Sequence, residues 1–187
     1  MAVRNMEHEQ EVVLGAILDH LEVMGVPYFI TGSIAGLHYG IDRATHDADI
    51  AFDASHRGFP RALADRIGTS MYIDVPENEI RQFNVITGES DFKVDFWPIG
   101  DDPFARSQLA RRVRGRIFGR TAWFASIEDL VLSKLRWYAK SNSDLQWRDL
   151  TRMIALHCDT LDRAYLERWA NDLGLREPLE RLFEQRG

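Results

Sequence analysis

Two aspartates stand one residue apart in a segment whose pattern is typical of a buried β-strand. In DADIAF, residues 47–52, side chains alternate between faces, so Asp47 and Asp49 share one face and the apolar residues share the other. Neighbours on one face of a strand lie about 6.5 Å apart, which lets two carboxylates converge on one or two divalent ions. An isolated Asp-x-Asp is also typical of a solvated strand edge or a turn, so the pair needs further support.

A third aspartate lies in a second strand-like segment, FKVDFW, residues 92–97. Asp95 shares a face with Lys93 and Trp97 in an apolar, aromatic setting, where a charge needs a partner. If the two strands lie side by side, three carboxylates converge. Such a set of hard oxygen ligands suits Mg²⁺ and the transfer of phosphoryl or nucleotidyl groups.

A glycine-serine turn precedes both strands, at the start of a short expected helix that ends near Tyr39. Gly32 permits close backbone approach, and the hydroxyl of Ser33 with the free N–H groups of a helix N-terminus favours phosphate. Arg43 adds a cation before the first acidic strand, where stabilisation of phosphate charge and an ordinary surface position are both open. The order Gly-Ser, Asp-x-Asp and strand Asp predicts a metal-dependent phosphate site.

The elements expected to carry these residues alternate between helix and strand up to about Ala125. A helical pattern over residues 11–23 stops at Gly25, and a short strand, VPYFIT, follows. Two antiparallel hairpins are expected. The first pairs RQFNVIT with DFKVDFW about the turn GES, and the second pairs RRVRGRIF with TAWFAS.

From Ser126 onwards helical patterns replace strand signals, near residues 126–140, 143–157, 161–173 and 176–185. The sequence therefore predicts the fold class α/β (α+β): a mixed sheet flanked by helices, with a C-terminal helical extension. We expect a core of residues 1–125 and a helical part of residues 126–187 that packs on the core and completes its site. No repeat or low-complexity linker separates the two parts.

Two charged residues of the helical part lie close to its apolar faces. Lys134 falls near the centre of a broad apolar stripe, at about 100° per residue. Its ammonium is expected either to snorkel to water or to meet a phosphate that neutralises it. Asp149 lies at the margin of the packing side of the next helix, a position also typical of a surface ion pair.

Composition places the chain among ordinary globular proteins. Of its 187 residues 45% are hydrophobic and 28% are charged, the net charge is -6, and no apolar run approaches the roughly 20 residues that span a bilayer. MAVRNMEHEQ lacks the apolar stretch of a secretory signal, so a cytoplasmic protein without membrane contact is expected. The lone Cys158 forms no internal disulfide. The five tryptophans are expected to pack rather than to stack on bases.

The run GSIAGLHYGIDRATHDADIAF, with FKVDFW after it, resembles the nucleotidyltransferase superfamily that shares the catalytic core of DNA polymerase beta. The resemblance implies that Gly32 and Ser33 hold the triphosphate of a nucleoside triphosphate (NTP). It also implies that two Mg²⁺ ions are bound by Asp47, Asp49 and Asp95.

A second stretch, SIEDLVLSKLRWYAK followed by SDLQWRDL, resembles the minimal, AbiEii-type branch of that superfamily, which includes toxins of toxin-antitoxin systems. In that branch a lysine at the place of Lys134 contacts the phosphates, and an acidic residue at the place of Asp149 lies near the nucleotide. The branch further implies tRNA as an acceptor and a cognate antitoxin as a partner.

These patterns together predict a Mg²⁺-dependent nucleotidyltransferase that moves a nucleoside monophosphate from an NTP to an acceptor, with Asp95 as a candidate proton acceptor. The alternatives are transfer to a small molecule of the aminoglycoside type or to a protein, and a non-catalytic nucleotide-binding or interaction module. Thermal melting with Mg²⁺ and NTP separates the enzyme from the interaction module, because a ligand that binds only the folded state raises the midpoint.

The only strongly basic stretch of the chain lies between residues 106 and 120, which hold six arginines and no acid. In a strand, Arg112, Arg114 and Arg116 share one face and form a solvent-facing cationic row. This arginine row is expected to follow the phosphates of an RNA acceptor, and it would repel a cationic aminoglycoside. Protection of an edge strand against pairing between molecules is the alternative.

Overall fold

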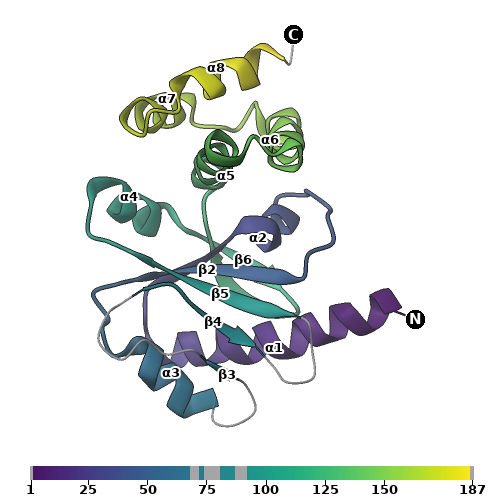
Figure 1. Ribbon diagram of the computed structural model, residues 1–187, viewed down its shortest axis with the longest axis vertical. Helices are drawn as coiled ribbons and strands as arrows, with labels where there is room; N and C mark the ends of the chain where they lie inside the picture. The colour runs from purple at the N-terminus through teal and green to yellow at the C-terminus, as the bar shows by residue number, and fades with distance from the viewer. Residues whose placement is uncertain (1, 68–71, 74–80, 87–91, 186–187) are drawn as a thin grey trace.

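A mixed β-sheet holds both acidic segments near its centre (Figure 1). The computed structural model describes residues 2–67, 72–73, 81–86 and 92–185. Within these residues the strands form one sheet in the order β3-β4-β5-β2-β1-β7-β6. The strands are β1 (Tyr28–Thr31), β2 (Asp47–Asp53), β3 (Tyr72–Ile73), β4 (Phe83–Ile86), β5 (Lys93–Ile99), β6 (Val113–Ile117) and β7 (Arg120–Phe124).

The two acidic strands are direct neighbours. β2 and β5 run parallel with Asp49 opposite Asp95, and β1 pairs antiparallel with the other edge of β2. β4 pairs antiparallel with β5, and β6 with β7, which confirms both predicted hairpins. The turn GES of the first hairpin lies outside the described residues. β7 joins β1 in parallel through Ile30 and Phe124.

Helices cover both faces of this sheet (Figure 1). α1 (Ala2–Met24) and α3 (Phe59–Ile67) lie on one face, whereas α2 (Gly32–His38) and α4 (Pro103–Arg111) lie on the other. α1 ends where Gly25 adopts a φ of 63°, in the left-handed region that glycine favours. The C-terminal helices lie on the side of α2 and α4, so this face of the sheet is enclosed between the two parts of the chain.

The helical part begins directly after β7. It contains α5 (Ile127–Ser141), α6 (Asp144–His157), α7 (Arg163–Asp172) and α8 (Arg176–Glu184), and all four predicted helical patterns are thereby confirmed. Serine side chains cap the first two helices: Ser126 accepts from the backbone N–H of Asp129, and Ser143 accepts from that of Gln146. The division of the chain after residue 125 stays a prediction.

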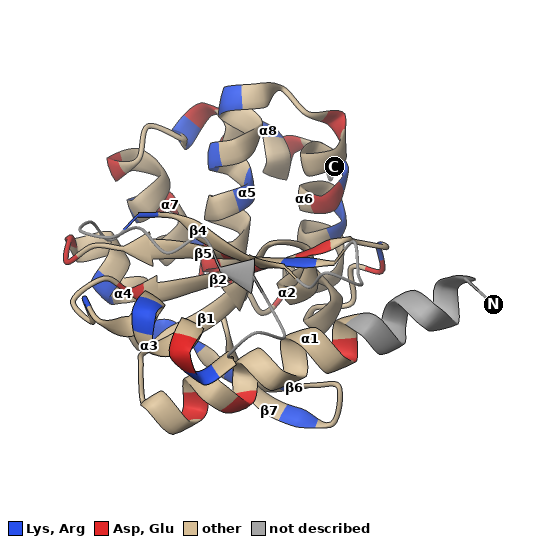
Figure 2. Ribbon diagram, turned by 60° about the horizontal axis from the view of Figure 1, so that its bottom comes forward, with Lys and Arg blue, Asp and Glu red and all other residues tan. Residues whose placement is uncertain are grey.

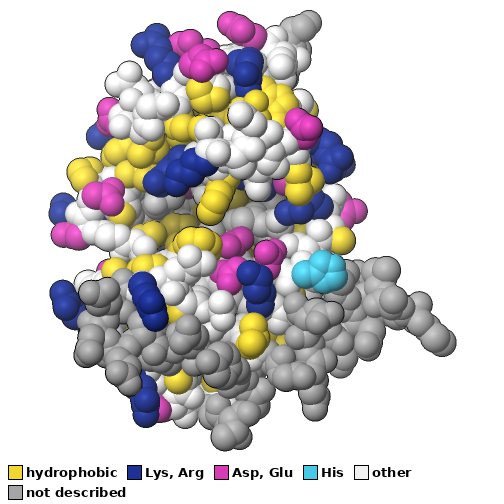
Figure 3. Space-filling view, viewed as in Figure 1, with side chains coloured by type: hydrophobic (Ala, Val, Ile, Leu, Met, Phe, Trp, Pro, Cys, Tyr) yellow, Lys and Arg dark blue, Asp and Glu magenta, His cyan; other side chains and the backbone are white. Residues whose placement is uncertain are grey.

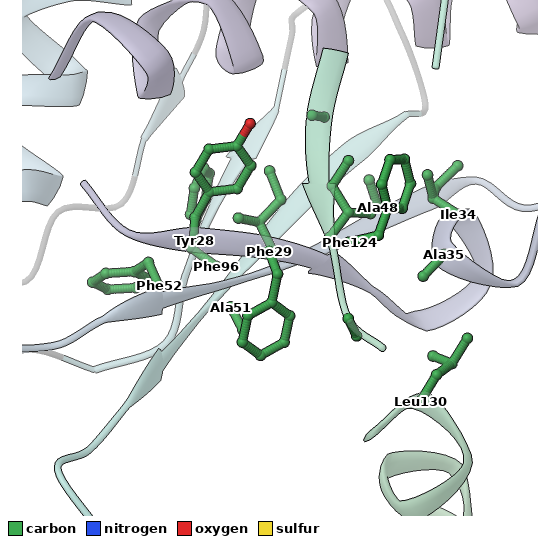
Figure 4. Close-up of a cluster of buried hydrophobic side chains, with 14 of the residues drawn as sticks. Tyr28, Phe29, Ile34, Ala35, Ala48, Ala51, Phe52, Phe96, Phe124 and Leu130 are labelled. Atoms are coloured by element: carbon green, nitrogen blue, oxygen red, sulfur yellow. The ribbon is translucent and has the colours of Figure 1, made fainter. Parts of the chain in front are cut away.

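Buried apolar side chains fix how the acidic strands sit in the sheet. Figure 4 shows aromatic and branched side chains of β1, β2, β5 and β7 packed together, with Leu130 of α5 near the sheet. Ile50 and Phe52 of β2 are fully buried, while Asp47 and Asp49 point to the opposite face. A slip by one residue would move the carboxylates into this core, so burial specifies the register.

Two helices, the short strand β3 and several boundaries differ from the prediction; α1, expected over residues 11–23, begins at Ala2. α3 and α4 were not expected, although Asp102 caps α4 by accepting from two backbone N–H groups and Pro103 follows it, a recognisable helix start. The start predicted for the strand RRVRGRIF lies two residues before the observed one, because Arg111 still belongs to α4 and β6 begins at Val113. A search of the described residues finds no helix long and apolar enough to cross a membrane.

Candidate active site

The three predicted carboxylates come together on neighbouring parallel strands. Asp49 of β2 and Asp95 of β5 are register partners, and Asp47 lies two residues before Asp49 on the same face. Figure 2 shows acidic positions of β2 and β5 near the middle of the sheet. The expectation that the two acidic strands lie side by side is confirmed.

Two of the carboxylates accept hydrogen bonds from side chains two residues earlier in the chain. Thr45 Oγ1 donates to Asp47 Oδ1 at 2.6 Å. Lys93 Nζ donates to Asp95 Oδ2 at 2.7 Å. This hydrogen bond raises the pKa of Lys93, and the charges of Asp95 and of the two β2 aspartates add to the rise. Lys93 therefore stays protonated and acts as a counter-ion within the field of all three carboxylates.

Asp49 is held from the neighbouring strand by Trp97, whose indole Nε1 donates to Asp49 Oδ1 at 2.8 Å. Burial raises the pKa of Asp49, and the nearby charges of Asp47 and Asp95 raise it further, while the bond from Trp97 acts in the opposite direction. The site thus holds like charges with reduced access to water. A bound cation would relieve the repulsion.

The donor chemistry of this cluster fits Mg²⁺. Carboxylate oxygens are the ligands this hard cation prefers, and the Lys93 ammonium already attracted to Asp95 shows that the cluster favours a positive charge. Across the described residues, no group of three or more His, Cys, Asp or Glu side chains is arranged to hold a metal ion. The three aspartates would therefore have to reorient, and Lys93 to release Asp95, to bind one; the two-ion site stays a prediction.

The glycine-serine turn lies against the carboxylates. Gly32 has a φ of 63°, and a Cβ atom on it would stand 1.9 Å from Asp49 Oδ2, so this close approach requires glycine. Ser33 follows in the first turn of α2, and its hydroxyl accepts a hydrogen bond from the guanidinium of Arg43. Both turn residues and Arg43 thus lie together at the cavity, and their contact with phosphate stays a prediction.

Lys134 reaches the site from α5 and is almost fully buried, so the expectation that it points inward is confirmed and the snorkelling alternative is wrong. Its Nζ lies 2.9 Å from Asp149 Oδ2 and 3.2 Å from Gln146 Oε1. Arg43 Nε lies 3.6 Å from the same Asp149 oxygen. Asp149 is buried in α6 and not on the helix surface, and it connects the two predicted phosphate-binding cations.

These elements enclose a cavity of about 730 Å³ between the sheet and the helical part. Figure 3 shows acidic, basic and hydrophobic side chains gathered about the hollow between the upper helices and the core. Every predicted site residue except Asp149 lines the cavity; those residues are Gly32, Ser33, Arg43, Asp47, Asp49, Asp95 and Lys134. Such a volume is typical of small-ligand sites, which span roughly 300–1,000 Å³.

Several lining residues were not among the predicted site residues. Among them are Gln108 of α4, Gln146 of α6, and Arg136, Trp137 and Lys140 of α5. A usable signal existed for α5 only, because its exposed face beyond Lys134 carries two cations and a tryptophan instead of the acids and small polar residues common on helix surfaces. Gln108 and Gln146 carry no signal in the sequence that separates them from other surface glutamines.

The arginine row is not the free cationic strip that the sequence predicts. The guanidinium carbons of Arg112 and Arg114 lie 4.4 Å and 4.2 Å from the centroid of the Trp123 ring, and Arg112 is only partly exposed. Arg114 also pairs with Glu22 of α1 at 3.3 Å. None of the three arginines lines the cavity that holds the carboxylates.

Comparison with solved structures finds this fold in antibiotic-modifying proteins. The solution structure of the antibiotic-resistance factor ANT(2'')-Ia is similar with a TM-score of 0.62, at 18% identity over 96% of each chain. A crystal structure of ANT(2'')-Ia in complex with adenylyl-2''-tobramycin gives 0.60, at 19% identity over 94% of this chain and 99% of that one. The lincomycin-bound lincosamide antibiotic adenylyltransferase LnuA gives 0.55, at 19% identity over 79% of this chain and 97% of that one.

At these identities the likeness establishes the fold, and the predicted nucleotidyltransferase-like α/β architecture is confirmed. No protein-family model and no curated protein sequence matches the chain. The assignment to the AbiEii-type branch stays a prediction.

Proposed function

We propose that this chain transfers a nucleotidyl group from an NTP to an acceptor hydroxyl in the presence of Mg²⁺. One observation carries the proposal: Asp49 and Asp95 stand in register beside a cavity that the buried cation Lys134 also lines. A site for a Mg²⁺–NTP substrate needs carboxylates for the metal and cations for the phosphates within reach of one another. The similarity in fold to an adenylyltransferase supports this assignment.

The residues divide into two groups by chemistry. Ser33, Arg43 and Lys134 are assigned to the β- and γ-phosphates. In the transfer, a bond forms between the acceptor oxygen and the α-phosphorus, the bond from the α-phosphorus to the leaving oxygen breaks, and pyrophosphate departs. The acceptor hydroxyl loses its proton to Asp95. Mg²⁺ held by the three aspartates would supply charge stabilisation at the α-phosphate.

The names of the structural neighbours support a hydroxyl on a small molecule as the acceptor, since LnuA is bound to lincomycin and ANT(2'')-Ia to adenylyl-2''-tobramycin. Transfer to tRNA through the arginine row, a toxin-like role and a cognate antitoxin stay predictions from the sequence. The partners of Arg112 and Arg114 within the chain make the arginine row a weaker candidate for RNA contact than the sequence indicates.

The experiment combines thermal melting with an activity measurement. MgATP, MgGTP, MgCTP and MgUTP are added singly to the protein, and we expect at least one to raise the midpoint, because it binds only the folded state. Release of pyrophosphate is then followed with candidate acceptors. Asp47→Asn serves as the inactive variant, and Asp65→Asn, an exposed carboxylate of α3, serves as its control. A midpoint that no Mg²⁺–NTP combination shifts would overturn the proposal.

A further inference from the structure

One wall of the cavity carries an aromatic surface with no role in the proposed transfer. Trp137 of α5 lines the cavity and is 50% exposed, in contrast to the expectation that the tryptophans pack. Its ring meets that of Trp97 edge to face, with centroids 6.1 Å apart and planes at 72°. Trp97 is itself fixed by its hydrogen bond to Asp49. The result is a firmly placed, open indole that offers a flat face to the ring of a ligand.

The geometry of transfer places the acceptor at this wall. The turn Gly32–Ser33 follows β1, Trp97 lies on β5, and β2 separates the two strands. In an in-line displacement the attacking and leaving oxygens lie on opposite sides of the phosphorus. With pyrophosphate leaving toward Gly32, the acceptor hydroxyl arrives from the β5 side. The pair of Trp97 and Trp137 therefore borders the acceptor.

The same wall is basic. Arg136 and Lys140 line the cavity near Trp137, and both are exposed. Lys140 Nζ lies 5.8 Å from the centroid of the Trp137 ring. Of the described residues that line the cavity, the only acids are the three aspartates of β2 and β5, whose charge Mg²⁺ would neutralise. An acceptor with several positive charges would be repelled here, and an anionic acceptor would be attracted.

We propose that this wall binds the acceptor as a nucleotide unit, with its base stacked on Trp137, its phosphate paired with Arg136 and Lys140, and a ribose hydroxyl presented to Asp95. An aromatic platform beside cations is the combination by which proteins hold individual nucleotides without reading their sequence. The inference rests on the proposed transfer and defines its second substrate. The product carries a new phosphodiester between the ribose oxygen and the α-phosphorus, the proton passes to Asp95, and pyrophosphate leaves.

A nucleotide unit has two sources, a free mononucleotide and the 3′ end of an RNA strand. Both are tested as ligands by calorimetry, with Mg²⁺ and α,β-methylene-ATP already bound so that no transfer occurs. The probes are AMP, a ten-nucleotide single-stranded RNA, and tobramycin as a polycation. Each is measured on the full chain and on Trp137→Ala, Trp137→Phe and the double variant Arg136→Gln/Lys140→Gln. The matched control is Arg114→Gln/Arg116→Gln, which removes two exposed arginines that do not line the cavity.

We expect AMP, the RNA or both to bind and tobramycin not to bind. Trp137→Ala should weaken binding about tenfold, and Trp137→Phe should restore most of it, because stacking needs an aromatic ring. For the RNA, Arg136→Gln/Lys140→Gln should flatten the slope of log affinity against log salt by about 0.7, the value for one phosphate of a single strand. The control pair should leave that slope unchanged, and affinity for α,β-methylene-ATP should stay the same in every variant.

The outcomes separate this inference from the proposed function. If α,β-methylene-ATP fails to bind the unsubstituted protein, the nucleotidyl transfer itself is wrong. If it binds but neither AMP nor the RNA does, or if tobramycin binds, the acceptor assignment is wrong. Loss of α,β-methylene-ATP affinity in Trp137→Ala would show that Trp137 stacks on the base of the NTP, and it would also overturn the inference. A slope flattened only by the control pair would move RNA binding to the arginine row.

Discussion

Lys134 and Asp149 form an ion pair of 2.9 Å in which each side chain is only 4% exposed. Asp149 also lies 3.6 Å from Arg43, so one carboxylate of α6 holds two cations of the cavity. Asp149 itself does not line the cavity. In this arrangement its contribution to a nucleotide site is to position Lys134 and Arg43, and a triphosphate would compete with it for their charge.

Replacing Lys134 should weaken NTP binding and the fold together. Lys134→Met fills a similar apolar volume, yet it removes a charged donor, and we expect a loss of about 1–3 kcal/mol in MgATP binding. It also leaves the buried carboxylate of Asp149 with Arg43 alone, which lowers the free energy of unfolding in urea. Arg148→Met, an exposed cation on α6, is the control and should change neither quantity. Unaltered MgATP affinity in Lys134→Met would remove this lysine from the site.

The opposite substitution should have the opposite effect on ligand binding. Asp149→Asn leaves Lys134 and Arg43 without their shared counter-ion, so the free energy of unfolding without nucleotide should fall. MgATP then meets cations that Asp149 no longer neutralises. The affinity of the variant for MgATP should therefore be equal to or higher than that of the unsubstituted protein. The rise in melting midpoint with MgATP should therefore be at least as large as in the unsubstituted protein. A marked loss of MgATP affinity would show instead that Asp149 contacts the nucleotide directly.

Asp49 should make the stability of the metal-free protein depend on pH. Burial, with the charges of Asp47 and Asp95, raises its pKa in the folded state, so the folded chain holds this proton more tightly than the unfolded chain. Its stabilising contribution is present below the unfolded pKa, about 3.9, and is lost as pH rises through the higher folded value. At neutral pH the charge of Asp49 thus lowers the free energy of unfolding.

Asp49→Asn should remove that dependence. Without Mg²⁺ the variant should be more stable than the unsubstituted protein at pH 7 and less sensitive to pH between about 4 and 7. Urea unfolding at several pH values measures this, with Asp65→Asn as the control. The same variant should lose Mg²⁺-dependent pyrophosphate release. A variant less stable at pH 7 would mean that the hydrogen bond from Trp97 outweighs the repulsion.

Sequence patterns predicted those parts of the fold that depend on neighbours in the chain. The alternation of DADIAF placed Asp47 and Asp49 on one face because a strand has a fixed period of two. Ser126 and Ser143 marked the starts of α5 and α6 because capping is local. α4 has an equally local signal in Asp102 and Pro103, so its omission reflects an unread cap and not a lack of information.

Long-range pairing could not be predicted in the same way. The register of Asp49 with Asp95 depends on how two distant strands meet, and no local pattern contains it. Predicting the ion pair of Lys134 with Asp149 would require the angle between α5 and α6. Predicting the contacts of the arginine row would require the position of Trp123. The sequence could therefore name which residues carry charge, but not which of those charges are already neutralised within the chain.

Gly32 gives the sharpest test of how closely the turn approaches the carboxylates. In Gly32→Ala the new Cβ would stand 1.9 Å from Asp49 Oδ2 and 2.9 Å from its Cγ, so the carboxylate must move, which disturbs the hydrogen bond that Trp97 donates to Asp49 Oδ1. The φ of 63° adds a backbone cost of about 1–2 kcal/mol for a residue other than glycine. We expect loss of pyrophosphate release and a fall in the free energy of unfolding beyond that cost.

Gly174→Ala separates the backbone cost of a positive φ from the cost of the contact with Asp49. Gly174 has a φ of 69°, and a Cβ atom on it would meet nothing within 4 Å, so this variant carries the backbone cost without the contact. It should lose about 1–2 kcal/mol in urea unfolding and keep full pyrophosphate release. The difference in unfolding free energy between the two variants then measures the displacement of Asp49. If Gly32→Ala matches Gly174→Ala in both stability and pyrophosphate release, the turn does not press on the carboxylate, and the phosphate-binding assignment of Gly32 and Ser33 is wrong.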